Sequence, residues 1–134
     1  MSAEQKDDHK KKVLLIDDDE LGMTVLERAL KQEGFEVLTT NDGEEGLGLA
    51  FSECPDIILL DIILPGMSGI DVLREVRRDG CCKDTPVILL TNYDKSDVIT
   101  EALDAGRCDF MIKTNWDIKD VVKRIKKHLR VKEV

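Results

Sequence analysis

Short apolar runs alternate with helix-like stretches along the chain from Val13 onward. Each run is ~4–6 residues long and is followed by charged or turn-forming residues, which favours a strand over a helix. The five runs are Val13–Ile16, Phe35–Thr40, Ile57–Leu60, Val87–Leu90 and Cys108–Ile112. Five predicted strands therefore form the skeleton of the domain.

The stretches between and after these runs carry apolar residues at helical spacing. The predicted helices cover residues 20–33, 43–52, 69–78, 95–105 and 116–130. The last has the clearest stripe, with apolar residues every three or four positions and basic residues mostly on the other faces. Strands that alternate with helices predict right-handed crossovers and a parallel sheet with helices on both faces.

The order of the strands follows in part from their composition. The first, third and fourth runs are uninterrupted apolar sequence, as expected for strands buried on both faces. The second contains Glu36 and the fifth contains Asp109, so these two belong at the edges. We therefore expect an α/β fold of the doubly wound, flavodoxin-like type, with strand order 2-1-3-4-5 and five flanking helices.

The composition excludes several classes of protein. The chain has 134 residues, of which 42% are hydrophobic and 36% charged, with a net charge of -8. This balance excludes disorder for most of the chain, and no apolar run is long enough to span a membrane. An acidic chain is a poor partner for nucleic acid. We expect a cytoplasmic domain over 13–130, a polar, disordered tail over 1–12 and a short C-terminal tail over 131–134.

The four cysteines do not form a metal-binding pattern. They are Cys54, Cys81, Cys82 and Cys108, without a C-x-x-C pair and with only two histidines in the chain. The adjacent Cys81 and Cys82 cannot bridge each other without strain. We therefore expect four free, mostly buried thiols in a reducing compartment.

Chemically active residues follow the predicted strands. Asp17 and Asp18 come after the first run, Asp61 after the third, Thr91 after the fourth and Lys113 after the fifth. The carboxyl ends of parallel strands meet at one edge, where ligands of such folds bind. Clustered carboxylates favour Mg²⁺, and an ammonium and a hydroxyl beside them suit a phosphoryl group. A carboxylate can itself be the nucleophile and form an aspartyl phosphate.

Asp19 has a different predicted role. Asp19 and Glu20 are better placed than Asp17 and Asp18 to cap the helix that begins near residue 20 and to complement its dipole.

Four segments together resemble the receiver domain of two-component response regulators. They are LLIDDDE, PDIILLDIILPGMSGIDVL, PVILLTN and DFMIKT, and the resemblance extends from about residue 13 to 130. The nearest type is a stand-alone receiver similar to chemotaxis regulators. The resemblance implies a signalling module that takes a phosphoryl group from a sensor histidine kinase or a phosphotransfer protein. It would catalyse only its own phosphorylation and dephosphorylation.

The resemblance also implies roles for individual residues. Asp61 would be the phosphoacceptor, and Mg²⁺, or Mn²⁺ in its place, would bind Asp18 directly and Asp17 with the help of water. Asp61 and the backbone carbonyl of Ile63 would complete the protein ligands. Lys113 and Thr91 would contact the phosphoryl group.

Further positions are implied to shape the site or to switch it. Phe110 would move together with Thr91, and phosphorylation would change the surface formed by the helix at 95–105, the strand at 108–112 and the helix at 116–130. That surface would signal to a downstream protein, with a phosphorylation-dependent homodimer as a further expectation. Pro65 and Gly69 would shape the loop after Asp61.

Two positions depart from the family pattern. Thr114 stands where the family usually has proline, and Asn92 stands where it usually has a small residue.

Ile63 and Tyr93 are expected to screen the phosphorus atom from water and to lengthen the life of the phosphorylated state.

Three alternatives compete with phosphorylation-controlled signalling. A degenerate receiver would bind a partner without phosphorylation. The complete set of site residues argues against this alternative: Asp17, Asp18, Asp61, Thr91 and Lys113. An FMN carrier of the same fold would need a phosphate-binding loop where this chain has consecutive acids at 17–20. A haloacid-dehalogenase-type phosphatase would need a second aspartate two residues after Asp61, where Ile63 stands.

Overall fold

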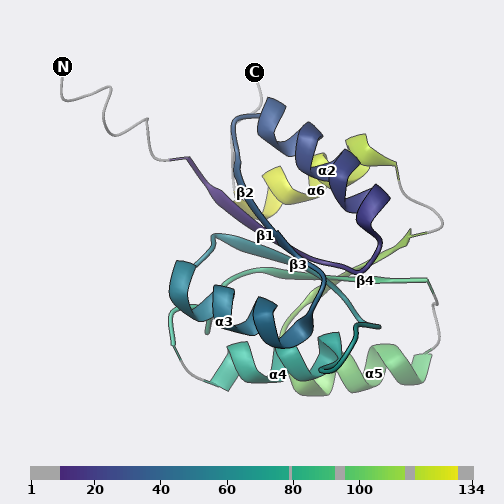
Figure 1. The fold of residues 1–134 in the computed structure, drawn as a ribbon. Coiled ribbons are helices and arrows are strands. Elements are labelled where there is room, and N and C mark those ends of the chain that lie inside the picture. The colour runs from purple at the N-terminus through teal and green to yellow at the C-terminus, as the bar shows by residue number, and fades with distance from the viewer. Residues whose placement is uncertain (1–9, 79, 93–95, 114–116, 130–134) are drawn as a thin grey trace.

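Five parallel strands form a single sheet in the computed structural model, which describes residues 10–78, 80–92, 96–113 and 117–129 (Figure 1). The order across the sheet is β2-β1-β3-β4-β5, which confirms the predicted topology and the doubly wound α/β class. The strands are β1 (Lys12–Ile16), β2 (Glu36–Thr40), β3 (Ile57–Asp61), β4 (Val87–Thr91) and β5 (Asp109–Ile112).

Helices cover both faces of the sheet. One face carries α2 (Glu20–Gln32) and α6 (Ile118–Leu129), and the other carries α3 (Gly43–Glu53), α4 (Gly69–Arg78) and α5 (Ser96–Ala105) (Figure 1). The predicted elements match these bounds to within two residues. Tyr93, Thr114 and Trp116, the last at the predicted start of the final helix, lie outside the described residues, as do the segments 1–9 and 130–134.

The alternation of side chains along each strand creates two separate apolar cores. On β3, Leu59 packs into the cluster under α2 and α6, while Leu60 packs into the cluster under α3, α4 and α5. Both side chains are fully buried. The central strands thus need apolar residues at every position, which explains their uninterrupted sequence.

The register of the sheet brings the carboxyl ends of the strands to one edge. Ile16 pairs with Leu60, Asp61 with Leu90, and Thr91 with Ile112. The residues that follow the strands therefore face the same space.

Aspartates cap two of the helices that leave this edge. Asp19 Oδ1 accepts a hydrogen bond from the backbone N–H of Gly22 at 3.2 Å, which confirms its predicted role at the start of α2. Asp42 does the same for α3, through the N–H of Glu44 at 3.1 Å. Each carboxylate satisfies an N–H that the helix leaves unpaired.

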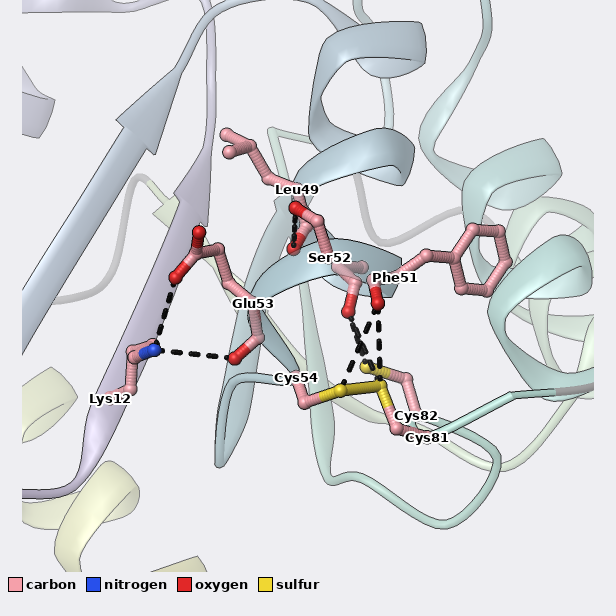
Figure 2. Close-up of a disulfide and its surroundings, with 9 residues drawn as sticks. Lys12, Leu49, Phe51, Ser52, Glu53, Cys54, Cys81 and Cys82 are labelled. Carbon is pink, nitrogen blue, oxygen red and sulfur yellow. Dashed lines mark hydrogen bonds and ion pairs between the residues drawn. A yellow bond between two sulfur atoms is a disulfide. The ribbon is translucent and has the colours of Figure 1, made fainter.

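The expectation of four free thiols is wrong. Cys54 and Cys81 form a disulfide, with their Cα atoms 5.7 Å apart (Figure 2). Cys54 ends α3 in the left-handed conformation (φ 47°), and the loop after α4 brings Cys81 against it. The sequence shows no sign of this pair because the two cysteines meet only through tertiary packing. Cys82 is buried as a free thiol and Cys108 is a half-buried one.

No helix within the described residues is both long and apolar enough to cross a membrane.

Candidate functional site

Three aspartates converge at the carboxyl edge of the sheet. Asp61 is the last residue of β3, and Asp17 and Asp18 directly follow β1. Asp17 and Asp61 are only 6% and 7% exposed, whereas Asp18 is open to solvent. One carboxylate oxygen from each of the three lies within 4.8 Å of the others. The predicted acidic cluster is therefore present.

Lys113, directly after β5, bridges the two buried carboxylates. Its Nζ lies 2.7 Å from Asp17 Oδ2 and 3.2 Å from Asp61 Oδ2. Burial of the ammonium disfavours its charge, but the hydrogen bond and attraction of Asp17, together with those of Asp61, outweigh this. The pKa of Lys113 is therefore raised above its usual value, and the side chain stays charged.

The pKa of Asp61 indicates that the Lys113 ammonium does not fully compensate the negative charge of the aspartates. Burial, followed by the hydrogen bond and repulsion of Asp17, raises the pKa of Asp61 to about 6, although Lys113 opposes the shift. A divalent cation reduces such repulsion, and carboxylate oxygens are its preferred ligands. The donor set therefore fits Mg²⁺ or Mn²⁺ on chemical grounds.

A cleft of about 540 Å³ opens over these residues. Thr91, at the end of β4, is 4% exposed and lines the cleft together with the exposed Asn92. The N–H of Ile63 donates to Asp61 Oδ1 at 3.3 Å, and the Ile63 side chain is 61% exposed at the rim. Asp17, Asp18, Asp61, Ile63, Thr91 and Lys113 are therefore brought together as expected from the sequence.

The loop after Asp61 folds back tightly at Gly69. The Gly69 N–H donates to the carbonyl of Ile62 at 2.8 Å, and a methyl group on Gly69 would collide with the Asp61 carbonyl oxygen. Only glycine allows this approach, so the start of α4 fixes the loop that carries Ile63.

Phe110 does not line the acidic cleft. It is half-buried in β5, paired in register with Leu89 and packed at the edge of the core under α3, α4 and α5. It also borders a separate hollow between β5 and α6. Its expected role as a switch stays a prediction.

A polar cluster of Asp109, Arg124 and His128 lies beside β5 and was not predicted from the sequence. Asp109 Oδ2 accepts hydrogen bonds from Arg124 Nη1 at 2.8 Å and pairs with His128 Nε2 at 2.8 Å, both on α6. Arg124 and His128 stand four positions apart, so they share a helix face. That spacing was the available signal, but it does not reveal which strand residue they would meet.

Fold and cleft together define a doubly wound α/β domain with an acidic site at the carboxyl edge of its sheet. The chain belongs to the response regulator receiver domain family, whose sequence pattern matches residues 13–126.

Solved structures agree with this assignment. A CheY-like receiver domain protein from Methanospirillum hungatei JF-1 is 27% identical, with a TM-score of 0.84 over 91% of this chain and 95% of that one. Chemotaxis protein CheY4 of Vibrio cholerae is 27% identical, with a TM-score of 0.82 over 89% and 98%.

A third structure contains a metal. The receiver domain of sensor histidine kinase PA1611 from Pseudomonas aeruginosa PAO1 has a magnesium ion coordinated in its active-site cleft. It is 26% identical, with a TM-score of 0.81 over 90% of this chain and 98% of that one.

Proposed function

We propose that this chain is a phosphorylation-controlled signalling receiver in which Asp61 accepts the phosphoryl group. The observation that carries the proposal is the convergence of two buried carboxylates on one lysine at the floor of an open cleft. An aspartate at the end of a buried strand is costly unless it has such partners.

The proposed reaction is transfer from a phosphohistidine. An Asp61 carboxylate oxygen forms a bond to phosphorus as the bond between phosphorus and the imidazole nitrogen breaks. The bonding pair of that bond stays on the imidazole, which then takes up a proton. Catalysis of this kind depends mainly on positioning and on charge compensation.

Each neighbouring residue has a part in that step. The Lys113 ammonium compensates the charge of the phosphoryl oxygens, and the Thr91 hydroxyl donates to one of them. Asp17, Asp18, Asp61 and the Ile63 carbonyl would hold Mg²⁺ or Mn²⁺, which supplies positive charge to the phosphoryl oxygens when bound. The magnesium-containing PA1611 receiver domain supports this part of the proposal.

Exposed apolar residues at the cleft rim and on α2, the helix that begins directly after the cleft residue Asp19, suit a protein phosphodonor. Leu21 and Val25, one turn apart on α2, are 82% and 54% exposed, and Ile63 at the rim is 61% exposed. Apolar surface next to a reactive group favours docking of a partner over random collision. The proposed donor is a sensor histidine kinase or a phosphotransfer protein, and the cytoplasm is the proposed location of the chain.

Phosphorylation is proposed to change the surface of α5, β5 and α6. The new group adds about -1.5 to -2 charges and draws Thr91 and Lys113 towards it. Thr91 is the last residue of β4, and Lys113 directly follows β5. Their movement would therefore reach Phe110 on β5 and the helices beside it. A downstream protein would bind the altered surface, and a homodimer is the second form that this surface could stabilise.

Intact-mass measurement with acetyl phosphate and Mg²⁺ tests the proposal. The wild-type chain is expected to gain the mass of one phosphoryl group, and Asp61→Asn is expected to gain none. Amide chemical shifts on β5 and α6 should change in the same phosphorylated sample, and size-exclusion chromatography reports any dimer. An unmodified wild-type chain would instead indicate a receiver that binds partners without phosphorylation.

A further inference from the structure

We propose that Cys54 and Cys81 form a reversible redox-modification site whose substrate is a small-molecule disulfide of the glutathione type. The site lies at the amino-terminal edge of the sheet, at the end of α3 and in the loop between α4 and β4, so it is remote from Asp61 (Figures 1 and 2). The inference does not rest on phosphorylation of that residue.

Both cysteines are accessible to a small reagent. Cys54 and Cys81 are exposed, whereas the neighbouring Cys82 is fully buried. The buried thiol lies 3.3 Å from the carbonyl oxygen of Ala50, and burial raises the pKa of Cys82. Less thiolate forms at Cys82, so exchange should be directed to the exposed pair.

The dithiol form is also accommodated by the structure. Carbonyls in the last turn of a helix can accept hydrogen bonds from side chains. In α3, those of Ala50 and Phe51 lie near the sulfur atoms, and the Ala50 carbonyl also accepts the backbone N–H of Cys54 at 3.1 Å. Cys81 Sγ lies 3.6 Å from Ala50 O. Both Cys54 Sγ and Cys81 Sγ lie 3.8 Å from Phe51 O (Figure 2). These distances suit weak S–H···O hydrogen bonds, which only the reduced cysteines can donate.

Both sides of the cross-link are held in place by other contacts. On the α3 side, Lys12 Nζ contacts the carbonyl of Glu53 at 3.3 Å and its carboxylate at 3.1 Å (Figure 2). On the loop side, Arg77 Nη1 donates to the carbonyls of Cys82 at 2.9 Å and Lys83 at 3.2 Å. Reduction therefore leaves the two cysteines close together, ready to be oxidised again.

Arg77 links the same loop to the start of β5. Its Nε and Nη2 donate to the carbonyl of Arg107 at 3.2 and 2.7 Å, and its side chain passes over Gly106. The loop thus keeps its place in the fold through Arg77 whether or not the disulfide is present.

The exchange proceeds in two balanced steps. One cysteine thiolate attacks glutathione disulfide, which forms a mixed disulfide and releases one glutathione thiolate. The second cysteine thiolate attacks the protein sulfur of that mixed disulfide, which forms the Cys54–Cys81 bond and releases a second glutathione. Two protein thiols are oxidised, one glutathione disulfide is reduced, and the two protons pass to the released thiolates.

The experiment equilibrates the full chain in buffers with different ratios of reduced to oxidised glutathione. Free thiols are then alkylated and the cross-links are mapped by peptide mass. We expect a Cys54–Cys81 bond that forms and disappears reversibly between strongly reducing and mildly oxidising ratios, with unchanged far-ultraviolet circular dichroism. Cys108→Ser is the matched control and should behave as wild type.

A second variant tests the route. Cys54→Ser leaves Cys81 without its partner, and this variant should accumulate a mixed disulfide with glutathione at Cys81. A bond that persists in the most reducing buffer would overturn the proposal, and so would a bond that never forms or one that involves Cys82. Loss of the fold on reduction would show a structural cross-link and would equally overturn it.

Discussion

Asp18 differs from the other two aspartates of the cluster because it is open to solvent and Lys113 does not contact it. Among the described residues its carboxylate has no ion pair, so its negative charge is available to a metal ion. Ligand charge is a main determinant of the affinity of such sites for hard cations. A substitution of Asp18 should therefore change metal binding without breaking the ion pairs of Lys113 with Asp17 and Asp61.

Replacement of Asp18 by Asn should weaken Mg²⁺ or Mn²⁺ binding by roughly tenfold, which corresponds to ~1.4 kcal/mol. Isothermal titration or Mn²⁺ titration measures the change directly. Asp71→Asn on the exposed surface of α4 is the control, because Asp71 pairs with Arg74 and not with the cleft. Equal affinities in Asp18→Asn and wild type would remove Asp18 from the ligand set.

Cys54 occupies a backbone conformation that normally favours glycine. With φ at 47° and ψ at 61°, it follows α3 in the left-handed region, where a side chain costs ~1–2 kcal/mol. In a reducing buffer, Cys54→Gly should therefore be more stable than Cys54→Ala by about 1 kcal/mol. Urea unfolding followed by circular dichroism measures the difference.

A position inside α3, the helix that Cys54 follows, provides the control for this comparison. Ser52 is exposed and lies within α3, where glycine is less favourable than alanine by about 1 kcal/mol. At this position the order of stability should be reversed, so Ser52→Ala should be more stable than Ser52→Gly. The same order at both positions would mean that Cys54 is not left-handed in solution.

At the scale of the elements, Asp109 joins β5 to α6. Burial alone would raise its pKa, but the hydrogen bonds from His128 and Arg124 outweigh burial, so the pKa of Asp109 lies below its usual value of 3.8. A carboxylate with a depressed pKa stabilises the fold above its unfolded pKa, and this contribution is lost as the pH falls through the folded pKa.

Asp109→Asn should therefore reduce the free energy of unfolding by about 1 kcal/mol near neutral pH, the upper end for partly exposed ion pairs. The difference from wild type should shrink below the usual pKa of 3.8 as the wild-type carboxyl becomes protonated. Urea unfolding at a series of pH values measures it. Asp84→Asn is the control, because its pair with Arg107 is largely exposed and should contribute little. A pH-independent difference would contradict this account.

The elements also show how far the sequence could predict the fold. Apolar runs and helical periodicity depend on local pattern, so strands such as β4 and helices such as α4 were predicted to within one residue. Asp61 and Lys113 were predicted to meet because both follow parallel strands. The Asp109–Arg124 contact and the Cys54–Cys81 bond depend instead on how loops and helix faces meet in three dimensions. No local pattern encodes those meetings.

At the scale of the whole molecule, one sheet separates two apolar cores. Leu59 and Leu60 are adjacent in β3, yet each belongs to a different core, and both are fully buried. The strand hydrogen-bonds to β1 and β4, so neither core can be lost without disturbing the sheet that supports the other. The acidic cleft at Asp61 begins at the end of this same strand.

Leu59→Ala and Leu60→Ala should each lower the free energy of unfolding by about 2–5 kcal/mol, because each leaves a cavity in a packed core. We expect unfolding to remain a single transition in both variants, since β3 couples the two cores. Urea unfolding followed by circular dichroism and by amide hydrogen exchange on α2 and α4 tests this, with Val25→Ala on the exposed face of α2 as the control. If Leu59→Ala released α2 at a lower urea concentration than α4, the cores would be independent. A signal at Asp61 would then have no rigid sheet through which to reach both helical layers.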